Sequence, residues 1–130
     1  MSSMVNYLNA NCGSAWTKWI WLDIEGSQYW TGSTSANRTW YENLLTACMN
    51  TAGVTCGIYS SYYQWEGIFG SVNYCHGSSQ PMWYAHYDDV CSMSDYVEYG
   101  CWTSPFGKQY QGTHSACNIG VDSDYFPSRP

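Results

Sequence analysis

Two acidic side chains, Asp23 and Glu25, stand two positions apart at the end of an apolar run, Trp-Ile-Trp-Leu-Asp-Ile-Glu (19–25). Residues i and i+2 of a β-strand share a face, so the two carboxyl groups are expected to project together, about 7 Å apart at the backbone. Burial beside an aromatic ring and the charge of a neighbouring carboxylate both raise the pKa of a carboxyl group. One of the pair is then expected to keep a proton, as a donor to a glycosidic oxygen requires. The alternative is a pair of solvated acids placed there by chance.

Further acidic side chains follow the other apolar runs. Asp122 comes directly after Ile-Gly-Val (119–121), and Asp124 shares its face. Asp122 is the favoured site residue of the two, although a turn-capping role is an equal alternative for either. Asp88 and Asp89 follow Met-Trp-Tyr-Ala-His-Tyr (82–87) and are interpreted either as site residues or as solvated loop acids. Functional groups gather where parallel strands end, so these acids are expected at one edge of a sheet.

The elements that must position these acids alternate between strand and helix. The pattern predicts strands at 18–25, 54–59, 82–87, 107–111 and 119–123, and helices at 4–11, 35–51 and 60–69, with 91–99 as loop or short helix. Ser35 is the expected N-cap of the helix 35–51, and Gly70 is expected to end the helix 60–69. The stripe expected to face the core from 35–51 consists of Trp40, Leu44, Leu45 and Cys48. Strands separated by helices predict an α/β fold with a parallel sheet of βα units, in a single domain over residues 1–130.

The composition is aromatic and poor in charge. Aromatic residues make up 18% of the chain and charged residues 11%, whereas ordinary domains carry about a quarter charged residues. Rings with a polar edge suit the faces of sugars as well as they suit a core. The net charge is −6, with four scattered cationic side chains, which argues against binding a phosphate backbone. No apolar run approaches the ~20 residues that cross a bilayer, so we expect neither a nucleic-acid nor a membrane partner.

Seven cysteines are spread along the chain without a Cys-x-x-Cys pair. Disulfides formed in an oxidising compartment explain them better than a zinc site. Seven is an odd number, so the cysteines cannot all pair within the chain. We expect one cysteine to be free, to pair outside the chain, or to have its partner in sequence that is absent here. Asn37-Arg38-Thr39 is an N-glycosylation sequon, which also fits a secretory route. We expect a protein that is secreted or that resides in a lysosome or phagosome. The acidic pI of 4.6 suits the lysosome or phagosome.

Other chemistries find less support. Ser60 and Ser61 lack a Gly-x-Ser-x-Gly setting, and the chain has no glycine-rich phosphate loop. His76, His86 and His114 are isolated from one another, and a lone histidine is more often structural than a ligand.

Five short motifs occur in one order along the chain: Trp-Leu-Asp-Ile-Glu-Gly (21–26), Gly-Ile-Tyr-Ser-Ser (57–61), Met-Trp-Tyr-Ala-His-Tyr-Asp (82–88), Lys-Gln-Tyr (108–110) and Gly-Val-Asp (120–122). In this order they resemble glycoside hydrolase family 25, the Chalaropsis-type lysozymes, especially its cysteine-containing eukaryotic branch. The resemblance implies an irregular, TIM-like β/α barrel. It also implies a muramidase that cleaves the β-1,4 bond between N-acetylmuramic acid and N-acetylglucosamine in bacterial peptidoglycan. No metal or organic cofactor is implied.

The same resemblance assigns roles to individual residues. Glu25 is similar to the general acid of the family, Asp23 to the residue that stabilises the reacting centre, and Asp122 to the acid on the last strand. The residues similar to those that hold or stack the sugars are Tyr59, Trp83, Tyr84 and Gln109.

The chain departs from the family pattern at its beginning. The family's domain opens with a strand that carries another acid, followed by further βα elements, and nothing here matches them. A full barrel has about 250 residues, against 130 in this chain. We therefore expect an incomplete barrel that lacks its N-terminal third, with a second chain as a possible partner that completes it. The alternative functions are a catalytically inactive carbohydrate-binding protein and a structural or assembly fragment.

Overall fold

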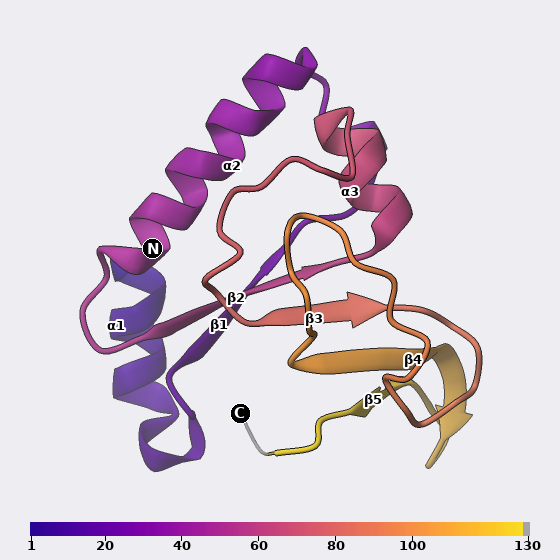
Figure 1. The fold of residues 1–130 in the computed structure, drawn as a ribbon. Helices are drawn as coiled ribbons and strands as arrows, with labels where there is room; N and C mark the ends of the chain where they lie inside the picture. Colours follow the sequence, from indigo (N-terminus) through magenta and orange to yellow (C-terminus); the bar gives the residue numbers. More distant parts are fainter. Residues whose placement is uncertain (129–130) are drawn as a thin grey trace.

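The computed structural model describes residues 1–128 and is built on a five-stranded sheet in the order β1-β2-β3-β4-β5 (Figure 1). The strands are β1 (Trp19–Asp23), β2 (Thr55–Ser60), β3 (Met82–Ala85), β4 (Gly107–Ala116) and β5 (Ile119–Tyr125). The helices are α1 (Ser2–Asn11), α2 (Thr34–Met49) and α3 (Tyr62–Phe69), with single 3-10 turns at Gly13–Ala15 and Ser27–Tyr29.

The sheet is parallel from β1 to β4 and antiparallel between β4 and β5. Strands β1, β2 and β3 are connected by α2 and α3, which confirms the predicted βα units for this part. The prediction of a wholly parallel sheet is wrong for β5, because a short turn joins it to β4 as a hairpin. Residues 86–106 form no helix, so β3 and β4 are joined by irregular chain. The curled sheet makes half of a barrel, and this confirms the predicted α/β class and incomplete TIM-like barrel.

The core lies between the outer face of the sheet and the helices α2 and α3. Alternate residues of β1 and the residue after it are buried there, as the period of two requires. The buried apolar side chains that the strands and their extensions place on this face are Ile20, Leu22, Ile24, Cys56, Ile58, Met82 and Tyr84. Those of the helices are Tyr41, Leu45, Cys48, Trp65, Ile68 and Phe69. Full burial of one large apolar side chain contributes about 1.5–3 kcal/mol, so this face holds the sheet and helices together.

Serine hydroxyl groups begin both helices of the core. Ser33, and not the predicted Ser35, is the N-cap of α2, and its hydroxyl accepts a hydrogen bond from the Ala36 amide at 3.3 Å. Ser61 caps α3 in the same way. Gly70 ends α3 in the left-handed conformation with φ 71°, as predicted.

The buried stripe of α2 differs from the predicted one. Trp40 and Leu44 are 50% and 39% exposed, and the buried residues are Asn37, Tyr41, Leu45 and Cys48. Tyr41 accounts for this rotation, because its fully buried ring packs edge-on against Trp65 with 5.3 Å between the ring centroids. Leu45 and Cys48 follow Tyr41 at helical spacing, so they were assigned correctly.

The inner face of the half-barrel carries a cluster of aromatic rings, Trp19, Trp21, Tyr59, Trp83, Phe106 and Phe126. Glycine at two strand positions makes room for them. A Cβ atom on Gly57 would lie 2.3 Å from the Trp21 ring, and one on Gly107 would lie 2.2 Å from the Phe126 ring. The rings therefore pack directly against the backbone of the neighbouring strands.

Four of the seven cysteines form disulfides, which confirms the predicted use of cysteine. Cys48–Cys56 joins the end of α2 to β2, and Cys75–Cys101 joins the segment after α3 to the segment before β4. The remaining three, Cys12, Cys91 and Cys117, are exposed and unpaired in residues 1–128. The expectation of one unpaired cysteine is therefore wrong.

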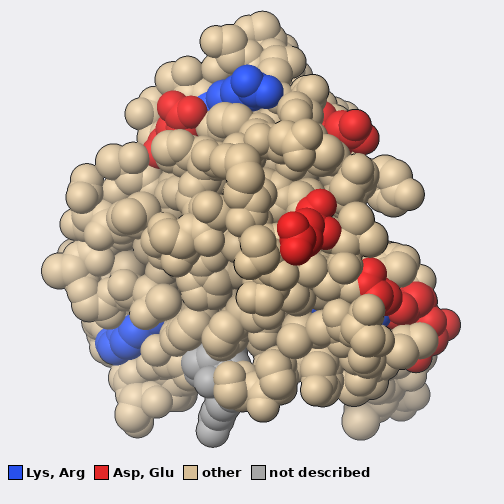
Figure 2. Space-filling view, in the orientation of Figure 1, with Lys and Arg blue, Asp and Glu red and all other residues tan. Residues whose placement is uncertain are grey.

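Charge is sparse over much of the surface. Figure 2 shows acidic side chains at several separate places on the visible face, with the largest group at the edge near the segment that follows β3, and few basic side chains on the same face. Within residues 1–128, no helix has the length and apolar character needed to cross a bilayer.

The sequon asparagine is not at the surface. Asn37 is 4% exposed, and its side-chain amide donates to the Ile68 carbonyl at 3.0 Å and to the Trp30 carbonyl at 3.4 Å. A glycan is attached through this same amide nitrogen, so the folded chain cannot carry one at this position.

We expect the chain secreted from a glycosylating host to carry no glycan at Asn37, because the folded structure buries the acceptor nitrogen. Peptide mass spectrometry of the folded protein measures this directly. A glycan found at Asn37 on folded, disulfide-bonded protein would contradict the described packing of α2.

We also expect Gly57→Ala to lower the free energy of unfolding by about 1–3 kcal/mol, because the added methyl group overlaps the Trp21 ring. Gly67→Ala is the matched control. Gly67 lies in α3 with Ser27 Cβ as its nearest neighbour at 4.0 Å, so alanine is expected to raise stability by up to about 1 kcal/mol. Urea denaturation of both variants checks the pair, and equal effects would count against the close ring packing.

Candidate active site

Asp23 and Glu25 project from the same side of the chain at the carboxyl end of β1. Asp23 is the last residue of the strand, and the Ile24 amide extends the pairing by donating to the Tyr59 carbonyl at 2.8 Å. Ile24 is fully buried, whereas Asp23 and Glu25 on either side of it are exposed. Gly26 then turns the chain with φ 66°. Burial of Ile24 therefore directs both carboxyl groups away from the core.

The pKa values of both carboxyl groups are raised. Partial burial raises the pKa of Asp23. Burial also raises the pKa of Glu25, and the negative charges of Asp23 and Asp122 raise it further. Glu25 therefore keeps its proton to higher pH than a fully solvated glutamate would, because burial and the two neighbouring charges disfavour its ionisation.

Asp122 lies near this site, but on a strand whose direction the sequence did not predict. It lies within antiparallel β5, so the expected position at the end of a parallel strand is wrong. Its carboxylate accepts hydrogen bonds from the Thr113 amide at 2.6 Å and from the Gln109 side-chain amide at 3.0 Å. The bond from Thr113 joins β4 to β5 at the irregular part of their pairing, and the charge of Asp122 acts on Glu25. The site role of Asp122 stays a prediction.

Gln109 links Asp122 to two tyrosines. The carbonyl oxygen of its side chain accepts hydrogen bonds from the hydroxyl groups of Tyr59 at 2.5 Å and Tyr87 at 2.7 Å. Burial raises the pKa of Tyr59, with further increases from Tyr87 and from Glu25 and Asp23. Tyr59 therefore stays a neutral donor, and the chain of bonds orients Gln109 toward Asp122.

Trp83 and Tyr84 lie on opposite faces of β3. Trp83 faces the inside of the half-barrel, with its ring centroid 4.6 Å from that of Tyr59, and its indole nitrogen donates to Asp124 at 3.2 Å. Tyr84 is buried on the outer face, and its hydroxyl donates to Asp95 at 2.9 Å. Burial, together with the charge of Asp122, raises the pKa of Asp124, against the bond from Trp83.

Two hollows meet at Glu25 and Gln64. The smaller, which we call the acidic pocket, encloses about 520 Å³ and is also lined by Asp23, Gly26, Gln28, Tyr29 and Trp30. The larger, which we call the tyrosine cleft, encloses about 560 Å³ and is also lined by Ser61, Tyr62, Tyr63, Tyr84, Ala85, His86, Tyr87, Asp95, Val97 and Tyr99. Of the four residues predicted to contact sugar, Tyr84 lines one of these two hollows. Tyr59, Trp83 and Gln109 lie on the inner face of the half-barrel, beside the acids.

The comparison with known proteins decides the family. A family model described as Lysozyme-like protein 1 matches residues 1–110. The chain is 44% identical over 128 residues to probable GH family 25 lysozyme 2 of Dictyostelium discoideum, covering 96% of this chain and 56% of the relative. The chain belongs to glycoside hydrolase family 25. It is also 40% identical over 129 residues to probable GH family 25 lysozyme 4 of the same organism, covering 97% of this chain and 56% of that protein.

This family 25 chain therefore spans about half the length of the curated relatives it matches. Among solved structures it is similar to a muramidase from Acremonium alcalophilum, with a TM-score of 0.66 at 22% identity over 98% of this chain and 62% of that chain. At this identity the likeness concerns the fold, and it agrees with the half-barrel described above. The family resemblance predicted from the five motifs is confirmed.

Sequence reasoning missed several residues that border the site of this family 25 chain. Gln64 lines both hollows, and His86 forms a hydrogen-bonded group with Asp95. His86 follows β3 as Glu25 follows β1, so the strand-end signal that selected the acids also pointed to it. Asp95 lies in the irregular segment 86–106, where no periodic pattern marks it. Lys108, one of the four cationic side chains of the sequence, joins the same group from a buried position on β4.

We expect Asp23→Asn to lower the pKa of Glu25, because the neighbouring negative charge that disfavours ionisation of Glu25 is removed. Carboxyl ¹³C chemical shifts followed against pH measure the change. Asp89→Asn is the matched control, since Asp89 lies outside the charges that act on Glu25. An unchanged or increased pKa of Glu25 in Asp23→Asn would show that the two acids are not coupled.

Proposed function

We propose that this chain is the acid-bearing part of a peptidoglycan hydrolase, a muramidase that cleaves the β-1,4 bond between N-acetylmuramic acid and N-acetylglucosamine. One observation carries the proposal: Glu25, whose pKa is raised by burial and by two neighbouring anions, stands where the acidic pocket and the tyrosine cleft meet. A glycan chain bound through both hollows would place a glycosidic oxygen at this junction. Membership of family 25 supports the same substrate class.

In this proposal Glu25 is the general acid and protonates the leaving oxygen of the bond. Asp23 and Asp122 are anions beside it, and they stabilise the positive charge that develops on the sugar ring in the transition state. Gln109 and the Thr113 amide keep Asp122 oriented toward the site. Separate environments thus give the carboxyl groups separate tasks.

The sugar rings are proposed to lie against the tyrosines of the larger cleft. Tyr63 is 81% exposed and Tyr87 59% exposed, so their ring faces are open to a ligand. Aromatic faces suit the CH faces of sugars, and the hydroxyl groups at their edges suit the sugar hydroxyls. Tyr59, Trp83 and Gln109 are proposed to support the inner side of the site.

A second candidate is a lysozyme-like protein that binds glycans without turnover, or one that acts only when a second chain completes the barrel. The position of β1 favours it: within residues 1–128, β1 pairs with β2 only and leaves one sheet edge open next to Asp23. Binding of glycan without release of cleaved product would support this candidate over the first.

The proposed location is outside the cell or in a lysosome or phagosome. The two disulfides support it, since such bonds persist in oxidising compartments. Bacterial cell walls are met in these places.

We expect Glu25→Gln to reduce lysis of bacterial cell walls by about 10²–10⁴-fold, because the amide cannot supply the proton. Turbidity of a cell-wall suspension, together with the new reducing ends released, measures the loss. Glu66→Gln, which changes an exposed acid of α3 away from both hollows, is the matched control and is expected to leave lysis unchanged. Lysis by Glu25→Gln at the native rate, with an unchanged circular dichroism spectrum, would remove Glu25 from the mechanism.

A further inference from the structure

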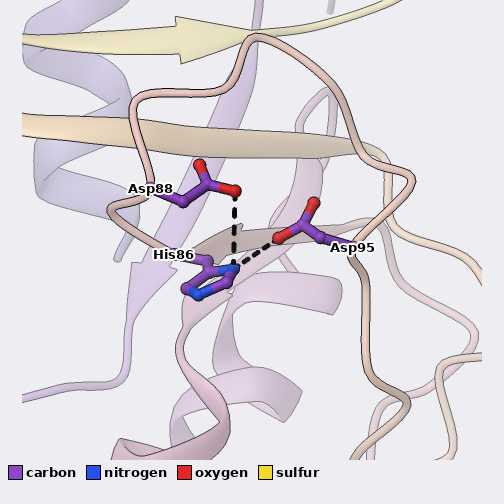
Figure 3. A group of neighbouring side chains, drawn as sticks. All are labelled: His86, Asp88 and Asp95. Carbon is purple, nitrogen blue, oxygen red and sulfur yellow. Dashed lines mark hydrogen bonds and ion pairs between the residues drawn. The ribbon is translucent and has the colours of Figure 1, made fainter.

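A second group of titratable side chains lines the tyrosine cleft, on the wall formed by the end of β3 and the segment after it. His86, Asp88 and Asp95 bring one nitrogen or oxygen atom each to within 4.8 Å of the others (Figure 3). His86 and Asp95 both line the cleft that Glu25 also lines. The mechanism proposed above uses none of the three.

The positive charge of this group comes from the protein itself. The ammonium group of Lys108 is fully buried on the outer face of β4 and lies 2.8 Å from the carboxylate of Asp88 and 3.0 Å from Asp95 Oδ1. Asp95 Oδ1 also accepts a hydrogen bond from the Tyr84 hydroxyl, and Asp95 Oδ2 contacts His86 Nδ1. Both oxygens of Asp95 are therefore occupied, so we interpret the group as an internal support and not as a cation site.

These contacts fix the charge of Asp95. Burial would raise its pKa, but the hydrogen bonds from His86, Lys108 and Tyr84 outweigh it and lower the pKa to about 2. An ionised carboxylate can only accept a hydrogen bond, so the bonding partners assign the proton of the contact to His86 Nδ1. In the neutral imidazole, Nε2 then carries a free lone pair.

The free nitrogen is available to a ligand. The side chain of His86 is 56% exposed, and Figure 3 shows its second ring nitrogen turned away from both carboxylates. Within residues 1–128, no group forms a hydrogen bond with Nε2. Nε2 of His86 is therefore a hydrogen-bond acceptor at the wall of the cleft, and an N–H or O–H group of a bound ligand can donate to it.

We propose that His86 is a ligand-binding residue of the tyrosine cleft, with its Nε2 accepting a hydrogen bond from a hydroxyl or acetamido N–H group of the bound glycan. Asp95 is its positioning residue, and Lys108 and Tyr84 hold Asp95 in place. This inference rests on the proposed function for the class of ligand. It adds a contact in the tyrosine cleft, outside the acidic pocket, where it helps to set which sugar is bound.

The test uses the full chain in a Glu25→Gln background, which prevents turnover, with a tetrasaccharide of alternating N-acetylmuramic acid and N-acetylglucosamine as the probe. At mildly alkaline pH, ¹⁵N spectra of the His86 ring are expected to show the proton on Nδ1 and to show a shift of Nε2 when the probe is added.

His86→Ala is expected to weaken binding of the probe about three- to tenfold, the effect of one hydrogen bond. Asp95→Asn is expected to change the ring tautomer and to weaken binding less. His76→Gln, outside the cleft, is the matched control and is expected to leave both readouts unchanged.

Cellotetraose, which has hydroxyl groups and no acetamido groups, separates the two donors: a shift of Nε2 with both probes indicates a hydroxyl, and a shift with the tetrasaccharide alone indicates the acetamido N–H. A proton found on Nε2, no shift with either probe, or unchanged affinity in His86→Ala would overturn the inference. The outcome is independent of the proposed hydrolysis. A native chain that binds through His86 but does not lyse cell walls contradicts the hydrolase, whereas lysis with unchanged affinity in His86→Ala contradicts only the role of His86.

Discussion

Burial of one face of β1 is the constraint on which the site depends. Ile20, Leu22 and Ile24 are buried against the helices, and the alternation of side chains leaves Asp23 and Glu25 on the other side. A register shift of one residue would exchange the two sets and place the carboxylates in the core. Each buried isoleucine or leucine opposes such a shift by about 1.5–3 kcal/mol. The acids are therefore presented by apolar packing that they do not themselves take part in.

The sheet separates acids of two kinds. On the inner side, Glu25 has other carboxylates as its charged neighbours, so its pKa is raised by burial and by like charge. On the outer side, Asp95 faces a buried ammonium and two further donors, which lower its pKa against the effect of burial. The first environment favours a protonated group that can give up its proton, and the second favours a permanent anion that can hold another side chain. Glu25, which follows β1, and Asp95, from the segment between β3 and β4, nevertheless line the same cleft.

The hairpin of β4 and β5 carries the polar side chains on the inner side of the half-barrel. It brings Asp122 to Gln109 and so to the two tyrosines bonded to it. Asp122 follows an apolar run, which predicts the end of a parallel strand, but it lies inside an antiparallel strand. Its charge nevertheless acts on Glu25. A run of three apolar residues does not reveal the direction in which a strand pairs, because direction depends on the partner strand.

The sequence by itself determined the structural features that depend on a repeating pattern of neighbouring residues. The two faces of β1, the βα alternation up to β3, the end of α3 at Gly70 and the family motifs are all patterns of neighbouring residues. Only the tertiary structure decided which cysteines pair, that α2 turns Tyr41 inward in place of Trp40, and that Asn37 is buried. It also decided that Lys108 meets Asp95. Each of these depends on contacts between residues far apart in the chain, and such contacts leave no period in the sequence for a local pattern to reveal.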